Sequence, residues 1–251
     1  MRIGLAGTGR IGAFHARTLR SLPGVDQLVV ADIDAALAAQ VATDLEVSAA
    51  GSIGELLDAQ LDGFVITAGT AAHADLIEAA LDRGIPTFCE KPVALDLGRT
   101  IALADLERRC EIPVHIGFQR RFDAGYRRTR EAIAAGEIGF VHTIRAATMD
   151  QSPPHAAYLP TSGGLFRDCS VHDFDIIRFV TGREARTVYA VGANKGDPFF
   201  TEAGDVDTAA ATLVLDDDTL VSVTATRYNG AGHDVRMEVH GATGTPGVGP
   251  D

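Results

Sequence analysis

Short apolar runs alternate with mixed polar and apolar segments through the first half of the chain. The apolar runs have the length of buried strands, and they lie at residues 2–6, 27–31, 63–67, 87–89 and 114–118. The segments between them have helical or alanine-rich patterns, at residues 11–21, 35–44, 71–83 and 95–109. Such alternation is typical of a parallel sheet that is covered by helices on both faces. We therefore predict a doubly wound α/β domain of the Rossmann type over residues 1–118.

The pattern changes after about residue 118, where long strands follow one another with fewer helices between them. Helices are predicted at residues 123–135 and 168–180, and strands at 141–149, 186–194, 206–215, 219–227 and 234–240. Asp216, Asp217 and Asp218 form a turn between two of these strands, which predicts an antiparallel hairpin. The pattern indicates an α+β domain over residues 119–251, with an open, mostly antiparallel sheet and one helical face.

The composition is that of a globular protein and disfavours several classes of partner. Hydrophobic residues make up 46% of the 251 positions and charged residues 22%, so a core of normal size is available. The net charge of −12 disfavours binding to nucleic acid and to anionic lipid. No apolar run reaches the roughly 18 residues that span a bilayer, and the glycine-rich start is not that of a signal peptide. Cys89, Cys110 and Cys169 form no CxxC pair, which favours reduced thiols, a cytoplasmic location and no metal site.

A GxGxxG motif, formed by Gly7, Gly9 and Gly12, directly follows the first strand. Its first glycine allows a tight turn, its second lets the backbone approach a pyrophosphate, and its third lets the helix pack closely on the strand. Asp32 ends the second strand, 20 residues after Gly12, where a carboxylate accepts ribose hydroxyls and repels a 2′-phosphate. We therefore predict NAD rather than NADP as the cofactor. Arg10, in the same loop, could help the site to tolerate the 2′-phosphate of NADP. The predicted cofactor loop consists of Gly7, Thr8, Gly9, Arg10, Ile11 and Gly12.

Glu90, Lys91 and Pro92 follow the strand at residues 87–89. Ligands of a doubly wound sheet bind at the carboxyl ends of its strands. Pro92 keeps Lys91 out of helical geometry, so the strand ends with Lys91 at that edge. An ammonium group there can bind a substrate hydroxyl and stabilise its negative charge. The other interpretation is a surface lysine that pairs with Glu90.

Asp168 and His172 are four residues apart at the start of a predicted helix and therefore share one face. A carboxylate beside an imidazole favours the charged ring and fixes its tautomer, which suits a general base that takes a hydroxyl proton. Asp175 falls on the same stripe, whereas Asp173 is turned away by about 100° and is expected to be solvated or at the domain boundary. The alternatives are a helix cap with a surface histidine, or a metal site that includes Cys169.

Other polar residues are weaker candidates. Five arginines surround one predicted helix and are expected to form a solvated face that pairs with carboxylates: Arg120, Arg121, Arg127, Arg128 and Arg130. Arg120 is the exception, because it comes just after the last parallel strand; we expect it to bind substrate together with Tyr228 and the turn at residues 150–152. The histidines expected to be structural or surface groups are His73, His115 and His155.

Five segments together resemble the Gfo/Idh/MocA oxidoreductases, and among them the inositol 2-dehydrogenases. The segments are AGTGRIG, Asp32, EKP at residues 90–92, IGFQRRFD at 116–123 and DCSVHDFD at 168–175. The resemblance implies that Lys91, Asp168 and His172 are catalytic, that Glu90 and Lys91 also lie at the cofactor, and that Lys91, Arg120, Asp168, His172 and Tyr228 bind substrate. It further implies a dimer or tetramer assembled through the open sheet.

The implied reaction is the NAD-dependent oxidation of a secondary ring alcohol, with myo-inositol as substrate and 2-keto-myo-inositol as product. The alternatives are another sugar dehydrogenase of this family, an NAD-dependent glycosidase and a catalytically inactive NAD-binding protein. Members of the family extend beyond the segment that matches residues 240–244, so the second domain is expected to be truncated and its sheet incomplete. We expect the residues after about Gly244, which carry no apolar pattern, to be unstructured.

Overall fold

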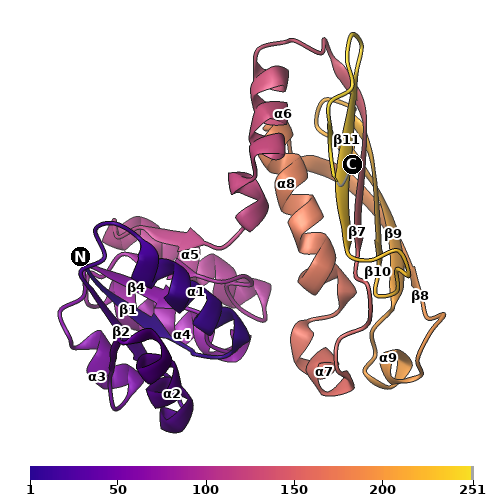
Figure 1. Ribbon diagram of the computed structural model, residues 1–251. Coiled ribbons are helices and arrows are strands. Elements are labelled where there is room, and N and C mark those ends of the chain that lie inside the picture. The colour runs from indigo at the N-terminus through magenta and orange to yellow at the C-terminus, as the bar shows by residue number, and fades with distance from the viewer. Residues whose placement is uncertain (250–251) are drawn as a thin grey trace. The chain divides into compact units, whose positions relative to one another are not determined.

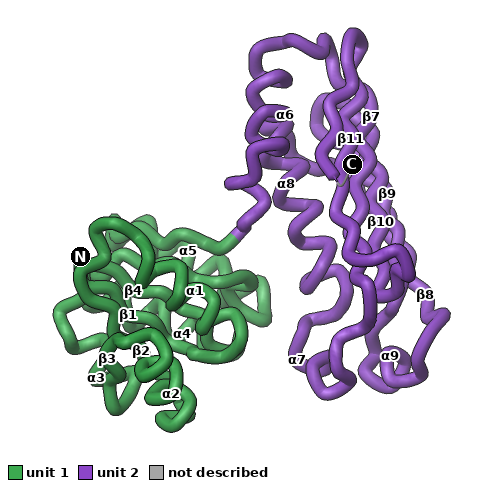
Figure 2. Tube along the Cα trace, viewed as in Figure 1, with its two compact units in different colours: residues 1–117 green, residues 118–251 purple. Residues whose placement is uncertain are grey.

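The computed structural model divides the chain into two compact units, Met1–Gly117 and Phe118–Asp251 (Figure 2). It describes residues 1–249. Unit 1 contains a six-stranded sheet in which all the paired strands are parallel, in the order β3-β2-β1-β4-β5-β6. The strands are β1 (Arg2–Ala6), β2 (Gln27–Ala31), β3 (Ser48–Ala49), β4 (Gly63–Ile66), β5 (Thr87–Cys89) and β6 (Val114–Ile116). This is the strand order of a dinucleotide-binding Rossmann domain, with the change of direction between β1 and β4.

Helices cover both faces of this sheet (Figure 1). They are α1 (Arg10–Ser21), α2 (Ala35–Leu45), α3 (Ile53–Leu57), α4 (Thr70–Leu81) and α5 (Leu97–Cys110). Successive residues of one strand enter two different cores: Leu5 packs with Ala16 of α1, whereas Ala6 packs with Ile77 of α4. Both faces of the sheet are therefore buried, and the prediction of a doubly wound sheet is confirmed.

Unit 2 contains a six-stranded mixed sheet in the order β12-β11-β7-β10-β9-β8. Its strands are β7 (Val141–Met149), β8 (Ala185–Ala193), β9 (Thr208–Leu215), β10 (Leu220–Thr226), β11 (Asp234–Gly241) and β12 (Gly247–Val248). Within the described strands of this second sheet, only β7 and β10 pair in parallel, and β9 and β10 form the expected hairpin. The predicted mostly antiparallel sheet is therefore confirmed.

Two long helices, α6 (Ala124–Ala134) and α8 (Val171–Thr181), pack on one face of this sheet (Figure 1). Val221 and Val223 of β10 face them and are buried, whereas Ser222 and Thr224 are exposed on the other face. The shorter helical segments are η1 (Gln119–Phe122), η2 (Ala156–Tyr158), α7 (Leu159–Ser162), η3 (Phe166–Ser170) and α9 (Phe199–Glu202). The helix predicted at 168–180 is thus two elements, because η3 is a π-helical turn that precedes α8.

The expectation of an unstructured segment after Gly244 is wrong for residues 247–248. Gly247 and Val248 form β12, which pairs with Glu238 and Met237 of β11, and Val248 packs against the core of unit 2. The segment lacks an apolar repeat because a two-residue strand needs only one buried side chain. Residues 250–251 lie outside the described residues. Within residues 1–249, no helix is both long enough and apolar enough to cross a membrane.

Candidate active site

The loop between β1 and α1 has the steric properties that its glycines predict. Gly7 has a φ of +96°, and a Cβ atom there would lie 2.3 Å from the backbone nitrogen of Ala68. A Cβ atom on Gly12 would lie 1.8 Å from the carbonyl oxygen of Gly7, whereas one on Gly9 would meet nothing within 4 Å. Gly7 and Gly12 are therefore required for packing, and Gly9 leaves open space in front of α1. No acidic residue lies in the first turn of α1, and Gly9 supplies no side-chain cap, so this helix end suits an anion.

Asp32 is held by the cofactor loop. Its Oδ2 accepts hydrogen bonds from the backbone nitrogen of Thr8 at 2.5 Å and from the Thr8 hydroxyl at 3.1 Å. Its Oδ1 accepts one from the backbone nitrogen of Asp34 at 3.0 Å. Burial alone would raise the pKa of Asp32, but these hydrogen bonds outweigh it and lower the pKa below its usual value. The carboxylate at the end of β2 is therefore ionised, half-buried and fixed in direction.

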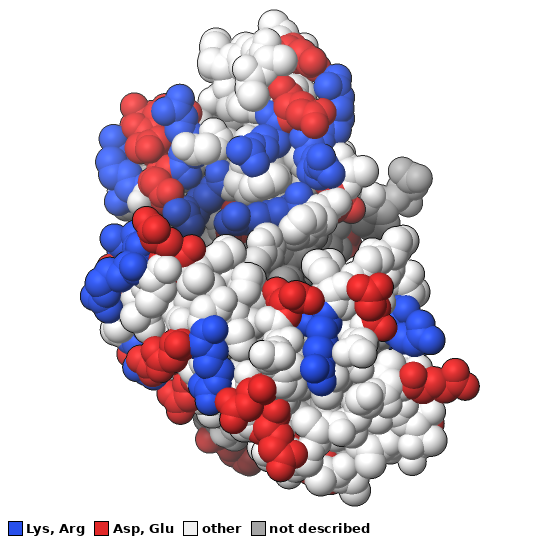
Figure 3. All heavy atoms as spheres, turned by 90° about the vertical axis from the view of Figure 1, so that its left-hand side faces the viewer, with Lys and Arg blue, Asp and Glu red and all other residues white. Residues whose placement is uncertain are grey.

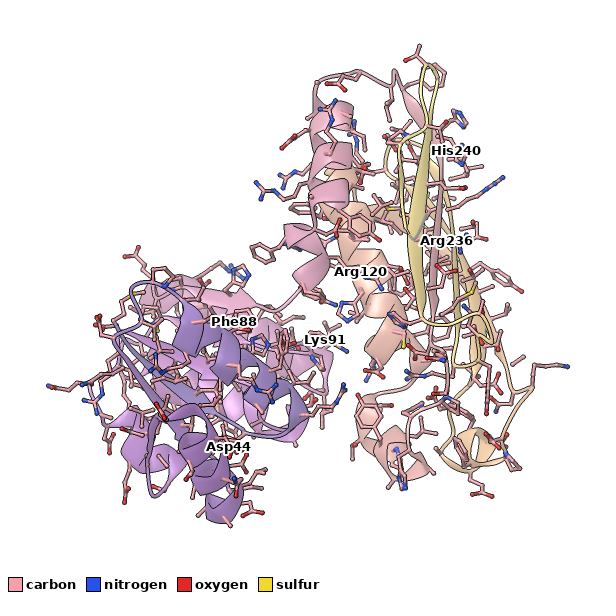
Figure 4. All side chains as sticks on the ribbon, viewed as in Figure 1. Asp44, Phe88, Lys91, Arg120, Arg236 and His240 are labelled. Carbon is pink, nitrogen blue, oxygen red and sulfur yellow. The ribbon has the colours of Figure 1, made fainter. Side chains whose placement is uncertain are left out.

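Glu90, Lys91 and Pro92 form the turn after β5, where Figure 4 labels Lys91. The Glu90 nitrogen donates to the Ile66 carbonyl at 3.0 Å and so extends the ladder between β4 and β5. Glu90 Oε1 lies 2.7 Å from Nε2 of His15 on α1. His73 on α4 contacts the Pro92 carbonyl, so helices on both sides of the sheet hold this turn. Lys91 itself is half-buried.

Asp168 and His172 lie in consecutive helical elements of unit 2, Asp168 in η3 and His172 in the first turn of α8. Asp168 Oδ2 accepts a hydrogen bond from Nη2 of Arg227 at 2.8 Å, and its Oδ1 accepts one from the Tyr158 hydroxyl at 3.0 Å. His172 is half-buried, and its ring meets the ring of Phe118 edge-on at 6.2 Å between centroids. A π-helical turn inside an α-helical segment is frequent at functional sites.

Sequence reasoning did not single out Arg227, which follows β10 and is 3% exposed. Its Nη1 lies 2.9 Å from Oδ2 of Asp150 and 2.9 Å from Sγ of Cys169. Burial alone would lower the pKa of Arg227, but the carboxylates of Asp168 and Asp150 raise it above its usual value. Burial raises the pKa of Cys169 to about 12, so the thiol keeps its proton and donates to Asp150 at 3.6 Å. The only signal in the sequence was a charged residue directly after an alternating strand.

Tyr228, next in the chain, is held by the loop between β8 and α9. Its hydroxyl donates to Oδ2 of Asp197 at 2.5 Å and accepts from the Asp197 nitrogen at 2.9 Å. The side chain is 37% exposed, so its ring remains accessible on unit 2. Its role toward a substrate stays a prediction.

Arg120 (labelled in Figure 4) is buried and forms an ion pair with Asp173; its role toward a substrate stays a prediction. Its Nη1 donates to Oδ1 of Asp173 at 2.6 Å, and its Nη2 donates to the Thr148 hydroxyl at 2.8 Å. The expectation of a solvated Asp173 is wrong, because its exposure is 0%: this side of α8 faces the sheet. Asp175, which is predicted on the same stripe as His172, forms an ion pair with Arg121.

The other arginines near α6 lie at the surface. Over much of the face shown in Figure 3, basic and acidic side chains are interspersed. Exposed ion pairs of unit 2 include Arg128–Glu137 and Arg178–Glu184. In the described part of the chain, no group of three or more His, Cys, Asp or Glu side chains is arranged to hold a metal ion.

Comparisons with known proteins agree with both units. A family model described as "Oxidoreductase family, NAD-binding Rossmann fold" matches residues 1–118, and one described as "GFO/IDH/MocA C-terminal domain" matches residues 126–246. A myo-inositol dehydrogenase of Streptomyces leeuwenhoekii is 43% identical over 251 residues, which cover 100% of this chain and 77% of the relative.

Solved structures give the same result. The crystal structure of a myo-inositol dehydrogenase from Corynebacterium glutamicum has a TM-score of 0.92 and 34% identity, over 100% of this chain and 75% of that one. A scyllo-inositol dehydrogenase from Lactobacillus casei, crystallised with NAD(H) and scyllo-inositol, has a TM-score of 0.89 and 30% identity. The match covers 99% of this chain and 76% of that one.

Proposed function

Since this chain belongs to the Gfo/Idh/MocA family of oxidoreductases, we propose that it is an NAD-dependent dehydrogenase that oxidises a secondary ring alcohol of a cyclic polyol. The substrate we propose is myo-inositol, and the product is 2-keto-myo-inositol. The observation that carries this proposal is the 43% identity to a myo-inositol dehydrogenase over the whole chain. The likeness to a scyllo-inositol dehydrogenase structure supports the same class of substrate.

The residues of unit 1 fit NAD. The open space at Gly9, in front of a helix end without an acidic residue, suits a pyrophosphate. The ionised Asp32 suits the adenosine ribose hydroxyls and would repel a 2′-phosphate, which favours NAD over NADP. The residues that would hold the cofactor are Gly7, Thr8, Gly9, Arg10, Ile11, Gly12, Asp32, Glu90 and Lys91. NAD, when bound, accepts the hydride from the carbinol carbon of the substrate.

His172 takes the proton of the substrate hydroxyl in this proposal. Asp168 supplies a negative charge that favours the imidazolium formed when His172 accepts that proton. The contacts of Asp168 with Arg227 and Tyr158 support this role, because they hold its carboxylate in one direction. The Lys91 ammonium stabilises the negative charge that develops on the substrate oxygen.

Tyr228 contributes a polar edge for the polyol, and its contact with Asp197 supports this role by fixing the ring. Arg120 supports the site from within the fold, because its guanidinium is bound to Asp173 and Thr148. These assignments, like those of Lys91, Asp168 and His172, rest on the family's pattern together with the contacts inside each unit.

The direct test is an assay of reduced nicotinamide formation with purified protein. The panel contains myo-inositol, scyllo-inositol and glucose, each with NAD and with NADP, and NAD binding is measured separately by calorimetry. We expect NAD-dependent oxidation of an inositol at a higher kcat/KM than that of glucose. NAD binding without turnover of any ring alcohol would contradict the proposal and favour an inactive NAD-binding protein. Cleavage of a glycoside without net reduction of NAD would favour a glycosidase.

We also propose that the chain self-associates through the sheet of unit 2. All nine residues of the edge strand β8 are exposed, including Val188, Tyr189 and Val191. Exposed apolar residues on an edge strand favour association with another chain. Light scattering coupled to size-exclusion chromatography should give the mass of a dimer or tetramer, and a monomer at micromolar concentration would contradict this proposal.

A further inference from the structure

Arg227 brings together side chains from three separate parts of unit 2. It follows β10, whereas Asp150 follows β7, and Asp168 and Cys169 belong to η3. One guanidinium contacts both carboxylates at 2.8–2.9 Å and the thiol sulfur at 2.9 Å. The Arg227 side chain is 4% exposed, and those of Asp168 and Asp150 are 12% and 25% exposed. Contacts so well shielded from water are only weakly screened by solvent.

Arg227 is a cation that both carboxylates of this cluster contact. Two carboxylates face one guanidinium, and the high pKa of Cys169 keeps its thiol neutral. Removing Arg227 would take away the guanidinium that offsets the repulsion between Asp150 and Asp168, and burial disfavours a carboxylate that loses such a contact. Arg227 therefore favours the ionised form of Asp168.

The direction of the contacts matters as much as the charge. Nη1 of Arg227 points to Asp150 and Cys169, while Nη2 points to Asp168. A planar guanidinium can serve both directions at once, whereas an ammonium is a point charge on a flexible stem. The hydroxyl of Tyr158 holds the second oxygen of Asp168. The carboxylate is thus fixed at both oxygens.

We propose that Arg227 is a positioning residue for the oxidation, acting through Asp168: it keeps that carboxylate ionised and aimed while the general base takes its proton. This inference rests on the proposed function of Asp168. Arg227, at the end of β10, thereby sets the charge and the orientation of the Asp168 carboxylate in η3. Tyr158 assists by holding the other oxygen.

The test compares Arg227→Lys, Arg227→Gln, Asp168→Asn and the double variant Asp168→Asn/Arg227→Gln, each in the full chain. Arg236→Gln is the matched control, because Arg236 forms a similar fork with Asp234 but is 55% exposed. We expect Arg227→Lys to lower kcat by about 10²-fold, the scale of a small misplacement of a catalytic group. KM for NAD should change less than about twofold, and the control should match the wild-type chain.

The double variant separates positioning from mere folding. If Arg227 acts through Asp168, the double variant should have the kcat of Asp168→Asn alone, because the two losses are not additive. Independent losses that multiply, or an Arg227→Lys variant with wild-type kcat, would overturn the proposal. Should Arg227→Gln fail to fold, the charge-preserving Arg227→Lys variant still decides the matter.

The failure of this inference can be told apart from the failure of the proposed function. If the wild-type chain oxidises no inositol, the proposed function is wrong whatever the variants do. The wild-type chain, Arg227→Gln, Asp168→Asn and the double variant then give a double-mutant cycle in urea unfolding, which reads the coupling between Arg227 and Asp168 without turnover. Where the wild-type chain does oxidise an inositol, coupling in unfolding together with independent losses in kcat would identify a purely structural arginine and overturn the positioning role.

Discussion

The imidazole of His73 lies between two backbone carbonyls, with Nδ1 2.7 Å from the oxygen of Pro92 and Nε2 2.9 Å from the oxygen of Ala68. Ala68 follows β4 and Pro92 follows β5, so one side chain of α4 joins two neighbouring loops at the carboxyl edge of the sheet. Each contact is a hydrogen bond when the ring nitrogen that faces the carbonyl carries a hydrogen. His73 is 2% exposed, and water does not compete for these carbonyls. The residue is structural, as its position in the sequence indicates, but it supports the turn that carries Lys91.

Replacement of His73 with Phe should destabilise unit 1 and slow the oxidation. A buried polar group that loses its partner costs about 1–3 kcal/mol, so the free energy of unfolding in urea should fall by that amount. A less firmly held Lys91 should lower kcat as well. His142→Phe is the control, because His142 is exposed on β7 and contacts only its neighbour Thr143 among the hydrogen bonds found for it. Equal stability of the two variants would show that the carbonyl contacts contribute nothing.

Asp32→Ser should weaken NAD binding and relax the discrimination against NADP. The substitution removes the charge that repels a 2′-phosphate and the carboxylate that Thr8 orients. Thr8→Val is the matched partner, since it removes only the 3.1 Å hydroxyl contact and keeps the backbone one at 2.5 Å; its effect should be smaller. Calorimetric titration with both cofactors measures the two affinities. A wild-type chain that binds NADP as tightly as NAD would refute the role of Asp32.

The pKa of Asp32 also gives a pH dependence with a definite sign. Its folded-state pKa is lowered, so the stabilisation it provides is present above the unfolded value of about 3.9 and is lost as the pH falls through the lower folded value. Asp32→Asn has no such titration. The difference in melting temperature between the two chains should therefore be constant at neutral pH and narrow below about pH 4.

Tyr158 should show the opposite dependence at high pH. Burial and the nearby Asp168 raise the pKa of Tyr158 to about 12, above the unfolded value of about 10. The stabilisation is present below pH 10 and is lost as the pH rises toward the folded value, because the unfolded chain then releases a proton that the folded chain retains. Between pH 10 and 12, the melting temperature of Tyr158→Phe should fall less than that of the wild-type chain. Parallel curves would show that the hydroxyl does not hold Asp168.

The fold could be predicted from the sequence where burial leaves a periodic pattern. The strands β1, β2 and β4 are nearly continuous apolar runs because both faces of the sheet are covered. The pattern fails for β3, whose two residues, Ser48 and Ala49, are both exposed. It fails again at β12, where one residue, Val248, makes the apolar contact.

The site could be predicted only in part, for a similar reason. Gly7, Gly12 and Asp32 are required by the local geometry of one loop and the strand beside it, so a short sequence motif identifies them. Arg227 is different, because its partners lie 59 and 77 positions away and no periodicity links them. Asp173 shows a second limit: helical spacing gives the angle between two side chains, but it does not say which of them faces the sheet.

The buried ion pair of Arg120 leads to a prediction of stability. Burial raises the pKa of Asp173, and Arg120 and Thr148 lower it only in part, so the ion pair keeps a charge that burial disfavours. Arg120→Met leaves that carboxylate alone and should cost about 3–5 kcal/mol in urea unfolding at pH 7. The double variant Arg120→Met/Asp173→Leu should recover much of this loss, because no buried charge remains. Arg128→Ala, which breaks an exposed pair, should cost at most about 1 kcal/mol.

The effect of pH on the same variant follows from the raised pKa of Asp173. A carboxyl group whose folded pKa lies above the unfolded one is destabilising at neutral pH, and the cost disappears as the pH falls through the folded value. The deficit of Arg120→Met should therefore shrink as the pH is lowered from 7. A deficit independent of pH would indicate lost packing rather than an uncompensated charge.

The last prediction concerns the general base. His172→Ala should lower kcat by about 10²-fold to 10⁴-fold, the usual contribution of a positioned acid or base. NAD affinity should not change, because the cofactor loop belongs to unit 1 and His172 to unit 2. His142→Ala is the control, since it removes an exposed imidazole from the same unit. Steady-state kinetics and calorimetric titration on the same preparations measure both quantities. Near-normal turnover by His172→Ala would exclude this residue as the base. An equal loss of NAD affinity and kcat would instead assign α8 a structural role, because a base that acts only on the substrate hydroxyl has no contact with the cofactor to lose.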